Sequence, residues 1–254
     1  MIRVLQKFAL LAIVALGLAS AGGMASADSA TLERVLKKGE LRVGMSGNQP
    51  PGNARSRTGQ MIGMEVDLAS AMAGAMGVEL NIVNRPFGEL LDELDKGKVD
   101  MVISGVAITP ERAAKVSFIG PYELSGKSIL TRDAVLAKAK SAAEFNQAHL
   151  ELAVLKNSTS EAFVKRNLPE AKIIPIEDYD EGVKRVLEGS VDGMIADMPI
   201  CILSVMRYPD AGLMTLNRPM SIEPIGIAVS ADDEQFQSLV QNYFATFERM
   251  GLLT

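Results

Sequence analysis

Short apolar runs alternate with amphipathic stretches over the first half of the chain. Apolar runs predict strands at 41–45, 79–83 and 99–104, and amphipathic stretches predict helices at 30–38, 64–76 and 87–96. The segment 46–60 is rich in Gly, Pro and polar residues, which predicts a loop. Such alternation is typical of an α/β fold with a mostly parallel sheet.

A second series of elements follows from residue 126 onward. The Ala/Lys-rich stretch 134–148 is predicted to be helical. Further strands are predicted at 152–155, 172–175, 191–196 and 225–229, and further helices at 161–167, 179–188, 199–207 and 233–250.

One short sequence motif, a repeated phrase of four residues, occurs in both halves of the chain. Gly97-Lys98-Val99-Asp100 and Gly189-Ser190-Val191-Asp192 each follow an amphipathic helix and precede a buried strand. The repeat predicts two α/β lobes of similar build, although two ordinary helix–strand units would also produce it. Asp100 and Asp192 occupy matching turn positions, and we expect them to be structural.

Open α/β sheets bind ligands beyond the carboxyl ends of their strands. Those ends are Ser104-Gly105 in one lobe and Asp197 in the other, so a cleft between the lobes is expected.

The predicted domain boundaries follow from the order of these elements. Since no Gly/Ser linker separates the halves, short crossings at 123–126 and 221–224 would serve as a hinge. The last strand and helix then return to the first lobe. The first lobe would comprise residues 28–122 and 225–254, and the second lobe residues 127–220.

The first 27 residues have the features of a signal peptide. A basic start precedes an apolar run at 8–18, and Ala25-Ser26-Ala27 is a small-x-small cleavage signal. The alternative is an uncleaved anchor, but the run is short for a membrane span. The only cysteine, Cys201, excludes an internal disulfide and a lipid-modified N-terminal cysteine. These features predict a periplasmic protein.

The charge and the single histidine narrow the classes of function. The formal net charge is −5 and no basic cluster occurs, which argues against binding nucleic acid or anionic membrane surfaces. His149 alone supports neither a histidine metal cluster nor a Ser-His-Asp triad. No metal ion and no cofactor are therefore expected.

The motif Thr109-Pro110-Glu111-Arg112 is the clearest indication of a ligand-binding position in the sequence. Thr109 is a good N-cap and Pro110 a good first helical residue. Arg112 would then lie among free backbone N–H groups, where it suits a carboxylate ligand. The alternative is a capped helix whose arginine pairs with a local acid such as Glu111.

A second helix start lies in the other half. Ser158, with Glu161 three residues on, forms a capping box that directly follows a strand. Two helix N-termini, one from each lobe, would then grip one anion. The alternative is simply a well-capped helix.

Asp197 would complete a zwitterion site. A carboxylate at a strand end accepts from an ammonium group, so Arg112 and Asp197 on opposite lobes would together bind the backbone of an amino acid. Phe87 would form an apolar wall of the pocket. The alternatives are an aspartate that caps the turn at Met198-Pro199 and a phenylalanine that belongs to the core.

Six segments resemble the bacterial extracellular solute-binding proteins of family 3, which are periplasmic receptors of polar amino acid ABC importers. The segments follow in order through the mature chain: 41–44, 63–69, 97–100, 109–112, 118–122 and 191–197. The resemblance implies a two-lobed periplasmic binding protein fold of type II that closes on its ligand like a flytrap.

The resemblance also assigns roles to single residues. It implies that Arg112 binds the ligand α-carboxylate, helped by backbone around Ala107 and Thr159. Asp197 and the strand end at Ser104-Gly105 would take the α-amino group, and Phe87 would stack on the ligand. The candidate ligand-binding residues are Arg112, Asp197, Thr109, Thr159, Ser104, Gly105, Ala107, Phe87, Ser158 and Gln49.

Of three departures from the family pattern, the first two leave the ligand's identity open. Asn48-Gln49-Pro50-Pro51-Gly52 has no aromatic residue where many members have one, so this wall of the pocket is polar. Ala107 replaces a hydroxyl residue and offers only its backbone. The chain stops at 251–254, where relatives usually continue through a helical tail, so a shortened C-terminus is expected.

The function predicted is that of a monomeric receptor without catalysis, which delivers a small zwitterion, an amino acid or derivative, to an ABC permease in the inner membrane. One alternative is a ligand sensor that docks to a membrane receptor. Another is an enzyme, because the fold includes cyclohexadienyl dehydratases. Those enzymes carry an acidic residue three positions after the second-lobe aspartate, where this chain has Ile200.

Overall fold

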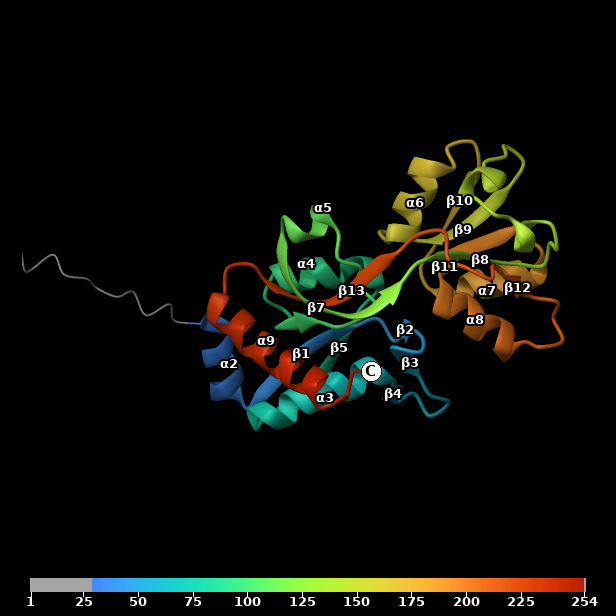
Figure 1. Ribbon diagram of the computed structural model, residues 1–254. Coiled ribbons are helices and arrows are strands. Elements are labelled where there is room, and N and C mark those ends of the chain that lie inside the picture. Colours follow the sequence, from blue (N-terminus) through green and yellow to red (C-terminus); the bar gives the residue numbers. More distant parts are fainter. Residues whose placement is uncertain (1–28, 254) are drawn as a thin grey trace, which may run out of the picture.

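The computed structural model describes residues 29–253, so the predicted signal peptide lies outside the described residues. Two lobes stand side by side, each built around a five-stranded sheet (Figure 1). The strand orders are β5-β1-β6-β13-β7 and β10-β9-β11-β8-β12. The predicted two-lobed α/β architecture is therefore confirmed.

The first lobe contains the N-terminal helices and the last helix of the chain. Its strands are β1 (Glu40–Met45), β5 (Glu79–Asn84), β6 (Met101–Val102), β7 (Val116–Ser125) and β13 (Glu223–Ser230). Its helices are α2 (Ala30–Lys38), α3 (Met64–Met76), α4 (Leu90–Asp95), α5 (Pro110–Ala113) and α9 (Glu234–Arg249), with a 3-10 turn η1 at Phe87–Glu89. A small side sheet consists of β2 (Asn48–Gln49), β3 (Asn53–Arg55) and β4 (Met61–Ile62).

The second lobe is continuous in sequence. Its strands are β8 (Lys127–Thr131), β9 (Glu151–Leu155), β10 (Lys172–Ile176), β11 (Gly193–Asp197) and β12 (Met214–Thr215). Its helices are α6 (Thr159–Asn167), α7 (Tyr179–Glu188) and α8 (Met198–Arg207), with 3-10 turns η2 (Leu136–Lys138) and η3 (Ala142–Phe145).

Both sheets combine parallel and antiparallel pairs in the same way. In the first, β1 is parallel to β5 and β6, while β13 is antiparallel to β6 and β7. In the second, β9 is parallel to β10 and β11, while β8 is antiparallel to β11 and β12. In each sheet the antiparallel pairs involve one strand, β13 in the first lobe and β8 in the second. Both strands begin close to the point where the chain passes from one lobe to the other.

Two chain segments cross between the lobes next to each other. β7 ends at Ser125, β8 begins at Lys127, and β13 pairs with β7 as far as Glu223 opposite Ser125. Gly126 lies between them, where an added Cβ would come within 1.9 Å of the Ser221 carbonyl oxygen. Only glycine allows the two segments to approach this closely.

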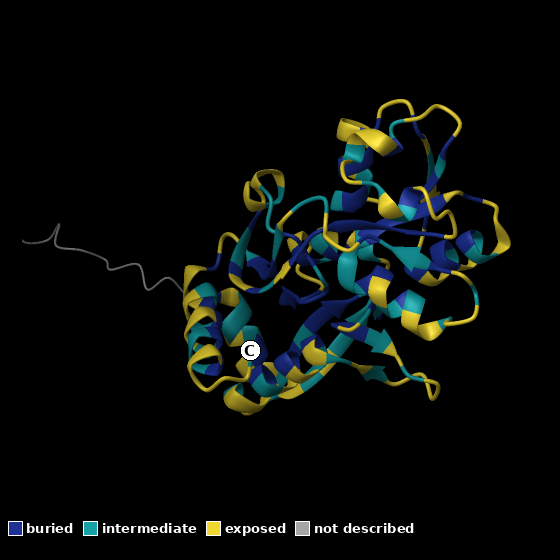
Figure 2. Ribbon diagram, turned by 45° about the vertical axis from the view of Figure 1, so that its right-hand side comes forward, coloured by how far each residue is buried: buried dark blue, intermediate teal, exposed yellow. Residues whose placement is uncertain are grey.

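Each lobe has its own apolar core, visible as the buried parts of the sheets and helices in Figure 2. In the first lobe, Leu41 and Val43 of β1 and Phe236 of α9 belong to one cluster of buried residues. In the second lobe, Leu130 and Met194 belong to a cluster on one face of the sheet, and Ile129 belongs to a cluster on the other. Strands buried on both faces explain the continuous apolar runs in the sequence.

Two local predictions were wrong. The stretch 134–148 forms only the short turns η2 and η3, because each has its own N-terminal cap. Asp133 accepts from the N–H groups of Val135 and Leu136, and Ser141 forms a capping box with Glu144. Between the turns the backbone is extended at Ala139.

The predicted loop 46–60 contains β2 and β3 of the side sheet. Buried Asn53 holds this segment, since its side chain accepts from Gly47 N at 2.7 Å and donates to Ser104 Oγ at 3.2 Å. Within residues 29–253 there is no helix with the length and apolar character needed to cross a bilayer.

The repeated phrase has the same structural role in both lobes. The Asp100 carboxylate accepts from Arg42 N at 2.7 Å, and the Asp192 carboxylate accepts from Glu151 N at 2.7 Å. Each aspartate thereby fastens the start of the neighbouring parallel strand. Asp100 is buried and is also paired with Arg34 and Arg42, whereas Asp192 is exposed.

This difference in burial predicts a difference in stability. Replacing Asp100 with alanine should lower the free energy of unfolding by about 3 kcal/mol, because two half-buried guanidinium groups lose their acceptor. The matched change Asp192→Ala should cost about 1 kcal/mol, since water replaces the lost hydrogen bond. Chemical denaturation of both variants checks this ranking, and an equal loss in the two would contradict it.

Candidate functional site: the cleft between the lobes

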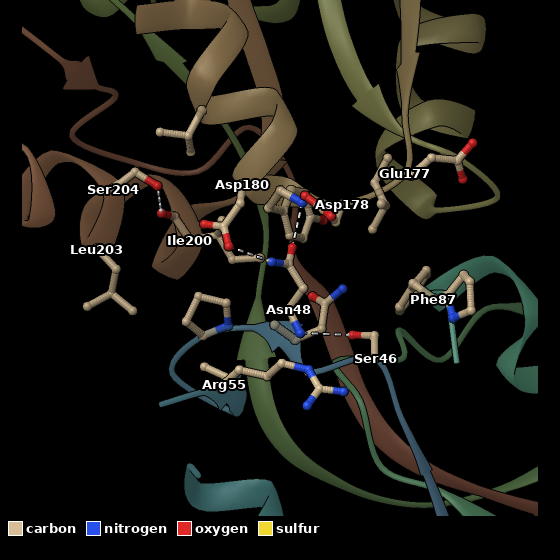
Figure 3. Close-up of a pocket in the computed structure, with 18 of the residues that line it drawn as sticks. Ser46, Asn48, Arg55, Phe87, Glu177, Asp178, Asp180, Ile200, Leu203 and Ser204 are labelled. Atoms are coloured by element: carbon tan, nitrogen blue, oxygen red, sulfur yellow. Dashed lines mark hydrogen bonds between the residues drawn. The ribbon is translucent and has the colours of Figure 1, made fainter. Parts of the chain in front are cut away.

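A cavity of about 620 Å³ lies between the side sheet and helices α7 and α8. Figure 3 shows Asn48 and Arg55 on the first-lobe side, facing Asp180 and Ile200 on the second-lobe side. The wall at Asn48 and Gln49 is polar, as the sequence predicts. A space of this size, with walls from both lobes, suits a small ligand.

Asn48 connects the two lobes directly. Its side-chain oxygen accepts from Tyr179 N at the start of α7, and its Nδ2 donates to Asp180 at 3.3 Å (Figure 3). A side chain of one lobe therefore caps a helix of the other.

Arg112 also bridges the lobes. Its guanidinium donates to the Ala107 carbonyl at 3.0 Å within the first lobe and to the Asn157 carbonyl at 3.4 Å in the second. The guanidinium lies 5.8 Å from the centre of the Phe87 ring, a cation–π arrangement. Arg112 forms no salt bridge with any residue in the described part of the chain. Burial lowers the pKa of Arg112 from its ordinary value, against the opposing attraction of Glu223 and Asp197.

The helix starts around Arg112 follow the predicted caps. The Thr109 hydroxyl accepts from Arg112 N at 3.3 Å, and the Ser158 hydroxyl accepts from Glu161 N at 3.2 Å. The Glu161 carboxylate accepts from Asn157 N and not from the cap residue itself. α5 has only four residues, so its dipole is small and the Arg112 side chain is the main positive group there.

Lys127 is the central charged group of the crossing between the lobes. It is 1% exposed, and its Nζ lies 2.6 Å from Asp197 Oδ1 and 3.0 Å from Glu223 Oε2. Lys127 and Asp197 are direct partners across β8 and β11, and Glu223 begins β13. Thr159 Oγ1 donates to Glu223 at 2.7 Å, which brings the start of α6 into the same cluster.

This lysine was missed in the sequence. The sequence did contain an indication of its role, because Lys127 is the first residue of a strand whose other residues are all buried. A lysine in such a strand needs buried carboxylate partners.

Ser104 and Gly105 have partners within the first lobe. The Ser104 hydroxyl donates to Ser46 Oγ at 3.2 Å, and Gly105 N donates to Glu65 Oε1 at 2.6 Å. Gly105 has φ 61°, and a Cβ there would lie 3.1 Å from the Gln49 side-chain oxygen.

A second, small cavity of about 30 Å³ lies at the crossing segments. Gly105 and Gln49 line it from the first lobe, Asp197 and Ile200 line it from the second, and Glu123 lines it from β7. Burial raises the pKa of Glu123, and the nearby charge of Asp197 raises it further.

The predicted site residues thus fall into four groups in the structure. Arg112, Ala107 and Phe87 meet at one position of the cleft, and Asp197, Gly105 and Gln49 meet at the small cavity. Thr159 joins the Lys127 cluster through Glu223. Ser104, Thr109 and Ser158 hold backbone and neighbouring side chains in place. Whether these residues contact a ligand stays a prediction.

This geometry defines a two-lobed binding protein with charged groups of both signs in the cleft between the lobes. The sequence profile of the bacterial extracellular solute-binding proteins, family 3, matches residues 41–254. The chain therefore belongs to this family, and the resemblance in its sequence segments is confirmed.

Individual relatives have different activities. A cyclohexadienyl dehydratase of Pseudomonas aeruginosa is 28% identical over 227 residues, covering 89% of this chain and 84% of the relative. The L-cystine-binding protein TcyJ of Escherichia coli is 25% identical over 250 residues, covering 98% and 93%. The crystal structure of the ancestral amino acid-binding protein AncCDT-1, a precursor of cyclohexadienyl dehydratase, has a TM-score of 0.80 and 32% identity and covers 88% and 96%.

Lys127 makes the pH dependence of stability predictable. Burial alone would raise the pKa of Glu223, but the Lys127 charge and hydrogen bonds from Thr159, Lys127 and Ser221 outweigh burial and lower it. A lowered pKa in the folded state stabilises the fold above the unfolded-state value of about 4.3. That contribution is lost as the pH falls through the folded-state pKa.

Lys127→Met should therefore lower the free energy of unfolding at pH 7 by about 3 kcal/mol, because two carboxylates lose their counter-charge. The difference from the unmodified protein should shrink as the pH falls below about 4.3 towards the lowered folded-state pKa of Glu223, where that carboxylate becomes protonated. Thermal unfolding across this pH range measures both effects. Lys156→Met, at an exposed ion pair with Glu177, is the matched control and should change little.

Proposed function

We propose that this protein is a periplasmic receptor that binds a small zwitterion, an amino acid or derivative, between its lobes and delivers it to an ABC importer of the inner membrane. The observation that carries the proposal is the Arg112 guanidinium, which touches both lobes and lacks a carboxylate partner among residues 29–253. A ligand carboxylate would supply that partner with two parallel hydrogen bonds.

The opposite charge lies nearby at the crossing segments. Asp197 and Glu123 line the small cavity, and the Gly105 backbone lies between them and Ala107, whose carbonyl holds Arg112. A molecule with a carboxylate at one end and an ammonium group at the other matches this polarity. The α-amino acids have that form, and relatives named as L-cystine-binding and amino acid-binding proteins support the assignment.

Closure of the lobes would accompany binding. The segments 123–126 and 221–224 are the proposed hinge, with residues 28–122 and 225–254 in one lobe and 127–220 in the other. Asn48 and Arg112 each form hydrogen bonds across the cleft, so they favour the closed form. A closed form with a defined surface is what a permease would recognise, and a monomer suffices for this role.

Export through the signal peptide at 1–27 is part of the proposal. The basic start, the apolar run and the Ala-Ser-Ala motif support it, and the family consists of extracellular proteins.

Arg112→Ala should weaken amino acid binding at least about 100-fold, because a buried charge pair with the ligand loses one partner. Protein from the periplasm of an expression host is unfolded and refolded to remove carried-over ligand, and the twenty standard amino acids are screened by thermal shift. Calorimetry then compares the unmodified protein with Arg112→Ala. Arg132→Ala, an exposed arginine bonded to the Leu187 carbonyl, is the control and should bind normally.

A folded Arg112→Ala variant that binds amino acids as tightly as the unmodified protein would contradict the carboxylate role. No binding of any amino acid by the unmodified protein would contradict the receptor function itself.

An enzymatic function is the second candidate, because one relative is a cyclohexadienyl dehydratase. That reaction needs a carboxylic general acid. At the position where the dehydratases carry it, this chain has Ile200, whose side chain is apolar and 4% exposed. This substitution supports binding without catalysis.

We expect no turnover of a cyclohexadienyl substrate. The refolded protein is incubated with the substrate, and formation of the aromatic product is followed by ultraviolet absorbance against an Arg112→Ala sample. Product formation that depends on Arg112 would show that the cleft is an active site and would replace the proposed receptor role.

A further inference from the structure

The small cavity at the crossing segments brings three carboxylates together. Glu65, Glu123 and Asp197 all line it, although they come from α3, β7 and the end of β11. Its volume of about 30 Å³ is enough to hold at least one water molecule. An ammonium group is of similar size, so the cavity has room for one such group.

Two of these carboxylates already have partners. Glu65 is 1% exposed and accepts from Gly105 N at 2.6 Å, and its side chain also bonds Tyr122 and Asn53. One oxygen of Asp197 accepts from Lys127 at 2.6 Å. Neither carboxylate therefore depends on a ligand for its first partner.

Glu123 differs from both. Its carboxylate has no hydrogen bond and no ion pair with any residue of the described range 29–253. Burial raises the pKa of Glu123, and repulsion from Asp197 adds to this effect. A cation placed in the cavity would oppose both effects at once.

Ser125 supplies a second group without a partner. It is 9% exposed, and its hydroxyl is buried without a hydrogen bond within the described chain. Ser125 lies two residues after Glu123 on β7 and lines the same cavity. A buried hydroxyl that lacks a protein partner is unusual and costly, which indicates that it bonds something the cavity receives.

We propose that Glu123 and the Ser125 hydroxyl bind the ammonium group of the ligand in this cavity, so that Glu123 selects amine-bearing solutes while Lys127 holds Asp197 as a fixed charge beside it. This inference rests on the proposed receptor function.

The spacing of the cleft agrees with such a ligand. Gly105 lines the small cavity, and Ala107 contacts the Arg112 guanidinium and pairs with Ile225 of the same cavity wall. Two residues of chain span at most about 7 Å. The Arg112 contact at Ala107 and the small cavity at Gly105 are therefore close enough for one small ligand to reach both.

Glu123→Gln tests the inference, since it keeps the shape of the side chain and removes its charge. The probes are the twenty standard L-amino acids and, for each, the carboxylic acid that lacks the α-amino group. Calorimetry should show about 10- to 100-fold weaker binding of amino acids by Glu123→Gln, because a charge-assisted hydrogen bond is lost. Binding of the acids without an amino group should not weaken.

Three further variants separate binding from structure. Glu123→Asp should recover part of the affinity, and Ser125→Ala should weaken amino acid binding by a smaller factor than Glu123→Gln. Glu79→Gln, at an exposed position on β5 of the first lobe, is the matched control and should bind like the unmodified protein. Thermal unfolding confirms that each variant is folded before its affinity is compared.

Each outcome decides the inference. Equal weakening for both kinds of probe, or unchanged amino acid binding by Glu123→Gln, would overturn the role of Glu123 while the receptor function stands. The same holds if the unmodified protein binds the acids without an amino group as tightly as the amino acids. No binding of any probe by the unmodified protein would overturn the receptor function and this inference together.

Discussion

The buried ion pairs of Lys127 with Asp197 and Glu223 connect the parts of this protein that have to act together. Asp197 ends a strand of the second lobe, Glu223 begins a strand of the first, and Lys127 opens the strand that enters the second lobe. Removing such charges from water costs several kcal/mol per ion, so each needs its partners at short distance. The cluster therefore defines how the two sheets meet, and with it the position of both cavities.

The cleft contains one cation and one carboxylate that lack partners of opposite charge within residues 29–253. These two groups give the cleft its charge pattern. Lys127 is matched by two carboxylates, whereas the Arg112 guanidinium, among residues 29–253, has hydrogen bonds to carbonyl oxygens and a contact with the Phe87 ring but no carboxylate partner. Glu123 lines the small cavity together with Gly105, and its carboxylate has no partner within residues 29–253. An unmatched cation and an unmatched anion in one cleft are the arrangement that a zwitterion would neutralise. We expect this electrostatic match, more than the apolar wall, to orient the ligand.

The two lobes share a structural device at the start of a strand. Asp100 and Asp192 each accept a hydrogen bond from the first residues of a neighbouring parallel strand, in β1 and β9 respectively. The repeated phrase in the sequence therefore marks a repeated way of aligning strands. Because the alignment is the same in both lobes, the carboxyl ends of the strands face one cleft from two sides.

The sequence by itself determined the elements and the family. Periodicity and caps placed α2, α3, α7 and α8 within a residue or two of their observed ends, and the repeat indicated two lobes. The stretch 134–148 was mispredicted because the cap at Asp133 and the capping box at Ser141 divide it into short turns, and composition does not reveal that competition. Arg112 stood out because the cap at Thr109 and the proline at Pro110, which begin its helix, are local in sequence.

Only the tertiary structure decided which charges are paired. Lys127, Asp197 and Glu223 are far apart in the chain, and so are Glu123 and Asp197, so no spacing rule connects them. Burial decides the chemistry of these groups, because a carboxylate that is partly removed from water without a partner is stabilised when a cation binds beside it. That enclosure arises where two segments from distant parts of the sequence cross between the lobes, which is a property of the folded chain alone.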